Sequence, residues 1–105
     1  MQEIDLDSFA AAHAAGGLVI DVREPEEYVD GHVPGARLMP LSRLGALATD
    51  LPGGQPVYVI CASGNRSQAG AGLLARRGVE AYSVAGGTSG WARTGRPIVV
   101  GVHAR

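Results

Sequence analysis

Short apolar segments alternate along the chain with turn residues and with longer segments of helical character. Val57 to Ile60 are four β-prone residues that follow the turn sequence Pro-Gly-Gly-Gln-Pro, so they predict a buried strand. The Ala- and Leu-rich segment from Gln68 to Arg77 predicts a helix directly behind it. Further short strands are predicted over 18–22, 37–40 and 79–84. Strands that alternate with helices indicate an α/β domain with a parallel sheet.

Three other segments have helical features. The apolar positions Ile4, Leu6, Phe9 and Ala12 to Ala15 predict an opening helix. Asp5 or Asp7 would cap this helix, and Gly16-Gly17 would end it. Pro25 suits the first turn of a short helix. A helix over about 42–50 is predicted from one apolar face, made of Leu41, Leu44, Leu47 and Leu51. Gly78 is expected to end the helix at 68–77.

The order of these elements predicts a site at one edge of the sheet. We expect a central parallel sheet of about five strands with helices on both faces. Such sheets place their sites beyond the C-terminal ends of the strands, and Asp21 and Cys61 both lie at such ends. The tail from Pro97 to Val102 could add an edge strand or dock on another molecule.

A chain of 105 residues can form one domain with its own core, which we place at about 18–95, followed by a tail at 96–105. No apolar run approaches the roughly 18 residues that cross a membrane. The acidic N-terminus also lacks the features of a secretory signal. We therefore expect a cytoplasmic protein without a membrane partner, either a monomer or a weak dimer.

The charges are distributed unevenly along the chain. Residues 1–30 hold eight acidic residues and one Arg, whereas residues 31–105 hold two acidic residues and eight Arg. The basic part could steer small anions towards Cys61, but the two parts could equally neutralise each other on the folded surface. The Arg residues are scattered and aromatic residues make up 5%, which argues against a nucleic-acid partner.

The segment after the strand at 57–60 has the composition of an anion-binding loop. Cys61 ends the strand, and Ala62, Ser63, Gly64, Asn65, Arg66 and Ser67 lead into the helix. Backbone N–H groups in front of a helix bind anions, and together with a nearby Arg they lower the pKa of a Cys. Cys61 is thus a candidate nucleophile, with Arg66 expected to lower its pKa and to hold an anionic substrate. The alternative is that Cys61 is a small buried core residue.

The remaining candidates for chemistry carry less weight. Because Cys61 is the only Cys, the chain can form neither an internal disulfide nor a Cys-based metal cluster. Any group that Cys61 acquires must therefore pass to another molecule. His32 lies in a Gly-His-Val-Pro-Gly turn, where a structural role is favoured over a catalytic one. His13 and His103 have no companions at ligand spacing, so we expect no metal and no cofactor.

Three motifs together resemble the rhodanese-like (sulfurtransferase) family. In that family four residues separate the active-site Cys from an Arg or small polar residue, often followed by Ser or Thr, as in Cys61, Arg66 and Ser67. The sequence D-V-R-E-P-E-E-Y and the later G-H-V-P-G-A, within 21–36, match the N-terminal signature of the family. Two glycines followed by Trp91 match its closing signature.

The resemblance implies roles for residues outside the loop. It places Asp21 and Arg23 beneath or beside the loop, with Arg23 paired to an acid of the following helix, for which Glu27 is the best candidate. These three residues either support the function or form a structural polar cluster, and we favour the cluster. Gly86 and Gly87 would permit close approach to the Cys61 loop, and Trp91 would lie in the core.

The resemblance further implies a sulfurtransferase in which Cys61 carries a persulfide. The donor would be a small sulfur anion such as thiosulfate, or a protein persulfide, and the acceptor a thiol or cyanide. Ala62 leaves Arg66 as the only charged loop residue, whereas relatives specialised for thiosulfate carry more basic residues there. Phosphatases and arsenate-handling enzymes of this fold are disfavoured, because phosphatases have five residues between Cys and Arg. A non-catalytic interaction module or a thiol sensor is the other alternative.

Overall fold

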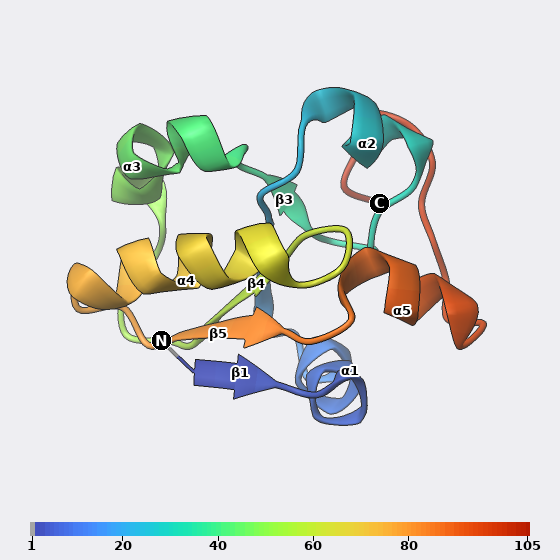
Figure 1. Ribbon diagram of the computed structural model, residues 1–105, viewed down its shortest axis with the longest axis horizontal. Helices are drawn as coiled ribbons and strands as arrows, with labels where there is room; N and C mark the ends of the chain where they lie inside the picture. Colours follow the sequence, from blue (N-terminus) through green and yellow to red (C-terminus); the bar gives the residue numbers. More distant parts are fainter. Residues whose placement is uncertain (1) are drawn as a thin grey trace.

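The computed structural model describes residues 2–105 and contains one five-stranded parallel sheet (Figure 1). The strand order across the sheet is β1-β5-β4-β2-β3. The strands are β1 (Gln2–Ile4), β2 (Leu18–Asp21), β3 (Arg37–Leu38), β4 (Val57–Ile60) and β5 (Ala81–Val84). The predicted α/β class and parallel sheet are therefore confirmed.

Helices cover both faces of the sheet. They are α1 (Leu6–Ala14), α2 (Pro25–Asp30), α3 (Leu44–Leu47), α4 (Asn65–Arg76) and α5 (Gly87–Arg93), with short 3-10 turns at Leu41–Arg43 and Ala48–Asp50. One core cluster joins the sheet to α3 and α4 through residues such as Leu44 and Leu74. The other joins the opposite face to α1 and α5 through Phe9 and Trp91.

The central strand β4 shows why the sheet has two cores. Val57 and Val59 belong to the cluster under α3 and α4, whereas Tyr58 and Ile60 pack in the cluster on the other face. Successive side chains of a strand point to opposite faces, so a strand with helices on both sides must be apolar at nearly every position. This explains the continuous apolar run that the sequence shows at 57–60.

Several local predictions need correction. The fifth strand is β1, before the opening helix. Of the two roles left open for the tail, the edge strand is not formed within residues 2–105. The helix predicted at 42–50 is a 3-10 turn, one turn of α3 and a second 3-10 turn. Helix α4 begins at Asn65, three residues early, and α5 was not predicted. By contrast, the Asp5 cap is confirmed, because the Asp5 carboxylate accepts the Ser8 N–H at 2.7 Å.

The C-terminal tail packs back on α2 and on the turn that follows it. Val99 pairs with His32 in an isolated antiparallel bridge, and the Gly101 N–H donates to the Val29 carbonyl at 2.9 Å. The Trp91 indole N–H donates to the Pro97 carbonyl at 2.7 Å. The tail thus holds α2 in place. None of the helices within residues 2–105 has the length and apolar character needed to traverse a membrane.

Candidate functional site

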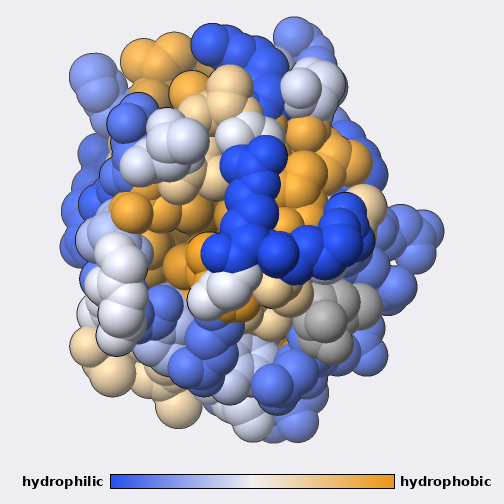
Figure 2. Space-filling model, turned by 90° about the vertical axis from the view of Figure 1, so that its left-hand side faces the viewer, coloured by the Kyte–Doolittle hydropathy of each residue, from blue (hydrophilic) through white to orange (hydrophobic). Residues whose placement is uncertain are grey.

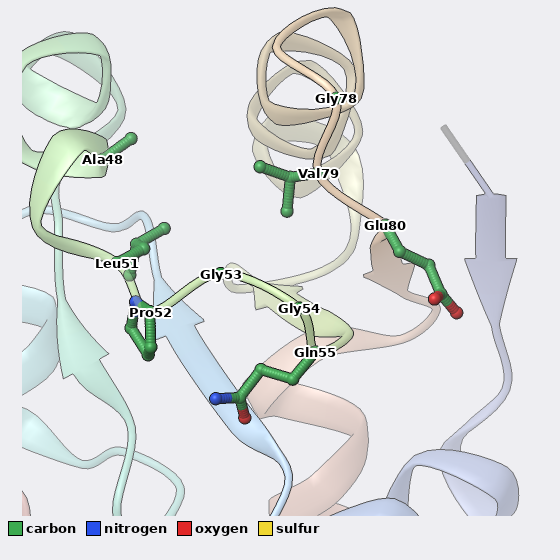
Figure 3. A pocket seen from close by; sticks show the side chains of 9 residues that line it. All are labelled: Ala48, Leu51, Pro52, Gly53, Gly54, Gln55, Gly78, Val79 and Glu80. Carbon is green, nitrogen blue, oxygen red and sulfur yellow. The ribbon is translucent and has the colours of Figure 1, made fainter.

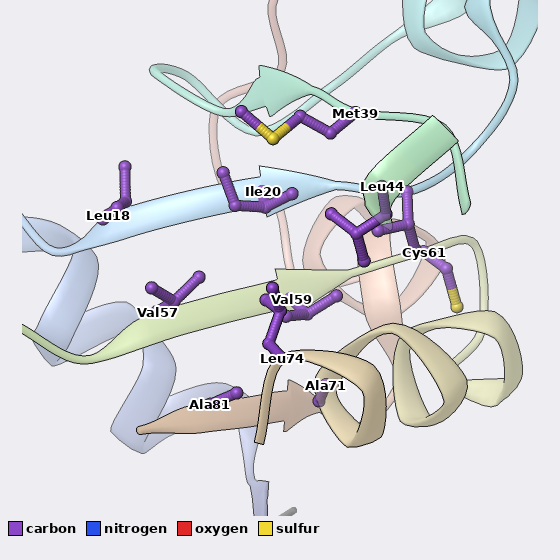
Figure 4. Close-up of a cluster of buried hydrophobic side chains, with 11 residues drawn as sticks. Leu18, Ile20, Met39, Leu44, Val57, Val59, Cys61, Ala71, Leu74 and Ala81 are labelled. Carbon is purple, nitrogen blue, oxygen red and sulfur yellow. The ribbon is translucent and has the colours of Figure 1, made fainter. Parts of the chain in front are cut away.

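Cys61 directly follows β4, at the edge of the sheet where β2 also ends. Asp21, the last residue of β2, is in register with Ile60, so the two predicted site residues lie at neighbouring strand ends. Cys61 is buried, with 0% of its surface exposed. Figure 4 shows it at the rim of one core cluster, with its sulfur directed towards the start of α4.

The sulfur of Cys61 lies among polar groups of its own loop. The Gly64 N–H donates to Sγ at 3.1 Å, and the Ser67 hydroxyl lies 3.4 Å from Sγ. Burial raises the pKa of Cys61, but hydrogen bonds from Ser67, Gly64 and Ser63 outweigh it and leave the pKa below its ordinary value. The Ser67 hydroxyl is itself 2.8 Å from the Ser83 hydroxyl of β5. These contacts favour a thiolate, which an inert core Cys would not need.

Arg66 is held by an acidic residue of α2. Its guanidinium donates to both carboxylate oxygens of Glu27, at 2.6 and 2.8 Å, and the two side chains are 38% and 35% exposed. The hydrogen bond from Arg66 lowers the pKa of Glu27 from 4.5 to about 2. The prediction that Glu27 pairs with Arg23 is therefore wrong. The loop cation that we expected to be available for a substrate already has a partner.

Arg23 instead pairs with Asp21, two residues before it. The Arg23 side chain donates to both Asp21 oxygens at 2.9 to 3.2 Å, and also to the Gly31 carbonyl at 2.7 Å. Both residues are buried, which makes the pair a tie between the end of β2 and the end of α2. This geometry supports the structural interpretation of Asp21 and Arg23. Removing either partner would leave a buried charge unpaired.

The glycines before α5 bring that helix against the Cys61 loop. The Thr88 N–H donates to the Cys61 carbonyl at 2.8 Å, and the Ser89 N–H donates to the Ala62 carbonyl at 3.0 Å. Gly87 has a φ of +57°, and a Cβ there would lie 2.5 Å from the Cys61 carbonyl oxygen. The predicted close approach is confirmed at Gly87. At Gly86 a Cβ would instead meet Leu6 of α1, at 3.2 Å.

The histidines have structural contacts. The His32 ring is buried, stacks on Tyr28 with 3.6 Å between ring centroids, and lies 2.7 and 2.8 Å from the carbonyls of Tyr28 and His103. His13 contacts the Pro34 carbonyl at 2.7 Å. Within residues 2–105 no three potential ligands are grouped so that they could hold a metal ion.

Two hollows border the sheet at opposite ends. One, of about 320 Å³, lies at the N-terminal ends of β4 and β5, far from Cys61 (Figure 3). Among residues 2–105, Glu80 is the only charged residue that lines it. The face at that end of the molecule mixes hydrophobic and hydrophilic side chains (Figure 2). The second hollow, of about 250 Å³, lies between α2 and α5 beside the Cys61 loop. We call it the α2–α5 groove; it is lined by Arg23, Glu27, Asp30, Gly31, Thr88, Ser89, Ala92 and Ile98.

The model of the rhodanese-like domain family matches residues 5–94, so the chain belongs to this family. The uncharacterized protein YqhL of Bacillus subtilis is 37% identical over 92 residues, which cover 87% of this chain and 72% of YqhL. The crystal structure of a rhodanese-related protein from Thermoplasma volcanium has a TM-score of 0.89 at 32% identity, over 95% of this chain and 99% of that one. A rhodanese-like domain protein from Staphylococcus aureus has a TM-score of 0.85 at 26% identity, over 97% and 100% of the two chains.

Proposed function

We propose that this protein is a sulfurtransferase that carries a sulfane sulfur as a persulfide on Cys61. The observation that carries the proposal is the environment of Sγ, which accepts the Gly64 N–H at 3.1 Å and lies 3.4 Å from the Ser67 hydroxyl at the start of α4. The lowered pKa of Cys61 increases the thiolate fraction near neutral pH, and the thiolate is the nucleophilic form. Family membership supports the same chemistry.

The reaction has two balanced steps. In the first, the Cys61 thiolate attacks the outer sulfur of a donor, a sulfur–sulfur bond forms at Sγ, and the donor sulfur–sulfur bond breaks. The leaving group takes the bonding pair and departs as sulfite from thiosulfate, or as a thiolate from a persulfide. In the second step, cyanide or an acceptor thiolate attacks the outer sulfur and leaves with it, which restores the Cys61 thiolate. Neither step needs a metal or an organic cofactor.

Loop size separates this proposal from phosphoester chemistry. Four residues lie between Cys61 and Arg66, and Gly87 packs against the loop backbone, so the ring of amides has little room to widen around a tetrahedral oxyanion. A non-catalytic interaction module would have no use for a thiol with a lowered pKa. A sulfurtransferase passes sulfur from donor to acceptor in repeated cycles, whereas a thiol sensor would react without such turnover.

Steady-state formation of thiocyanate from cyanide tests the proposal, with thiosulfate and an organic persulfide as separate donors. We expect turnover with at least one donor and none for Cys61→Ser, whose fold is checked by its thermal unfolding. Hydrolysis of an aryl phosphate should be absent or marginal. Sulfur transfer that survives in Cys61→Ser, or phosphatase turnover comparable with sulfur transfer, would overturn the proposal.

A further inference from the structure

We propose that the site selects organic persulfides, which carry at most one negative charge, over the thiosulfate dianion. Glu27 is the residue that discriminates between these donors, and the α2–α5 groove holds the organic group. This inference rests on the proposed function, since it names the donor for the same Cys61. Two independent features carry it: the charge around the mouth of the loop, and the space beside it.

The charges at the mouth are compensated or negative. Arg66 is the only charged residue between Cys61 and Ser67, and Glu27 occupies both arms of its guanidinium. Glu27 is fixed in this position because its carboxylate also accepts the Glu24 N–H at 3.1 Å, as part of the capping box of α2. A dianion such as thiosulfate therefore meets no uncompensated cation from the loop, and would have to compete with Glu27 for Arg66.

The α2–α5 groove adds no positive charge. Of the charged residues that line it, Arg23 is paired with Asp21, and Glu27 is paired with Arg66. Asp30, the remaining one, is exposed and forms no ion pair with any residue in 2–105. Two compensated pairs and one free carboxylate leave the groove with an excess negative charge, which repels a dianion more strongly than a persulfide with at most one negative charge.

The same groove can hold a carbon-bearing group. Thr88 and Ser89 line it, and their N–H groups bind the carbonyls of Cys61 and Ala62, so the groove adjoins the reacting loop. Ala92 and Ile98 contribute apolar surface, and the Thr88 hydroxyl oxygen is buried without a hydrogen-bond partner within residues 2–105. Thiosulfate would leave this space unused, whereas the organic part of a persulfide R–S–SH can occupy it.

The transfer of sulfur from such a donor does not create a dianion. The Cys61 thiolate attacks the terminal sulfur of R–S–SH, forms the new bond at Sγ and breaks the donor sulfur–sulfur bond. The thiolate R–S⁻ leaves with the bonding pair, and Cys61–S–SH remains. A single negative charge passes from Cys61 to the leaving group, so this step needs no additional cation to hold a dianion.

Glu27→Gln is the sharpest test of the charge argument. Gln can still accept the Glu24 N–H and one hydrogen bond from Arg66, so the substitution removes the charge with little loss of structure. Glu26→Gln is the matched control, because Glu26 is the exposed neighbour of Glu27 in the same turn of α2 and removes an equal charge. The donors are thiosulfate and the persulfide of 2-mercaptoethanol, each with cyanide as the acceptor.

We expect Glu27→Gln to raise kcat/KM for thiosulfate at least roughly fivefold, mainly through a lower KM, because Arg66 becomes available to the dianion. The gain should shrink with added salt. For the persulfide, kcat/KM should change less than about twofold in either variant, because this donor carries at most one negative charge and its organic group supplies part of the recognition. Equal responses of Glu27→Gln and Glu26→Gln to thiosulfate, or equal losses with both donors, would overturn the role of Glu27.

A second variant tests the groove. Ala92 is an exposed residue of α5, so Ala92→Phe can fill the groove without disturbing the core, and Ala92→Ser is its small control. Ala92→Phe should lower kcat/KM for the organic persulfide roughly tenfold more than it lowers kcat/KM for thiosulfate, and Ala92→Ser should affect the two donors alike. An unchanged persulfide rate would contradict the groove as the seat of the organic group. Absence of sulfur transfer from either donor in the wild-type protein would instead refute the proposed function itself.

Discussion

Gly87→Ala should separate the Cys61 loop from α5. In the native protein the N–H groups of Thr88 and Ser89 bind the carbonyls of Cys61 and Ala62 at 2.8 and 3.0 Å. An alanine Cβ at Gly87 would lie 2.5 Å from the Cys61 oxygen and 2.6 Å from the Ala62 oxygen. Because both contacts are with backbone atoms, the loop and the start of α5 have to separate.

The cost can be worked out from these contacts. The left-handed backbone at Gly87, with φ of +57°, costs about 1 kcal/mol for a residue that has a Cβ. Weakening the two hydrogen bonds adds about 1 kcal/mol each, and the remaining overlap about 1 kcal/mol more. The total of about 4 kcal/mol corresponds to a fall in Tm of about 15 °C or more for a domain of this size.

Urea and thermal unfolding measure this difference, and Gly78→Ala is the control. Gly78 also has a positive φ, +84°, but a Cβ there meets no atom within 4 Å, so the control isolates the backbone term. We expect Gly78→Ala to lose about 1 kcal/mol and to keep its sulfur transfer, whereas Gly87→Ala loses both stability and activity. If the two variants lose equal free energies of unfolding, the close packing at Gly87 does not hold the Cys61 loop against α5.

Three further predictions concern individual side chains. Ser67→Ala should raise the pKa of Cys61, because it removes a hydrogen bond between Ser67 and Sγ, and this rise should exceed the one caused by Arg66→Ala. The pH dependence of Cys61 alkylation measures both pKa values. Equal rises would contradict Ser67 as the stronger influence on the pKa of Cys61. His32→Ala should cost about 3 kcal/mol of unfolding free energy but leave sulfur transfer by the folded protein intact, so a loss of turnover at unchanged stability would point to catalysis. Glu27→Gln should have a free energy of unfolding up to about 1 kcal/mol below that of the wild type above pH 4.5, because the pKa of Glu27 is lowered. In urea titrations this difference should shrink as the pH falls towards 2. A difference independent of pH would exclude the charge of Glu27 as its cause.

The strand ends that carry Asp21 and Cys61 could be predicted because buried parallel strands need continuous apolar runs. Both β2 and β4 have such runs, and their C-terminal ends meet at one edge of the sheet. Strand β1 could not be predicted, because Gln2–Ile4 is only three residues long and forms a strand through its pairing with β5. No periodic pattern marks an edge strand of this length.

Helix α5 and the partner of Glu27 depend on tertiary contacts. The sequence G-T-S-G at the start of α5 has low helix propensity, and its first N–H groups are held by the carbonyls of the Cys61 loop. The family resemblance pairs Arg23 with an acid of the following helix, and this led to the wrong Arg for Glu27, whose partner Arg66 lies 39 residues away. The choice is decided by Asp21, which occupies Arg23 with good bidentate geometry.

Intact-protein mass spectrometry tests the persulfide on Cys61 most directly. The protein is measured as purified and after incubation with thiosulfate or with the persulfide of 2-mercaptoethanol, alongside Cys61→Ser. We predict that the wild-type protein gains the mass of one sulfur atom, more completely from the persulfide, and loses it on treatment with cyanide or dithiothreitol. Cys61→Ser should gain nothing. A wild-type protein that takes up no sulfur from either donor, or a Cys61→Ser variant that takes up as much, would contradict the account.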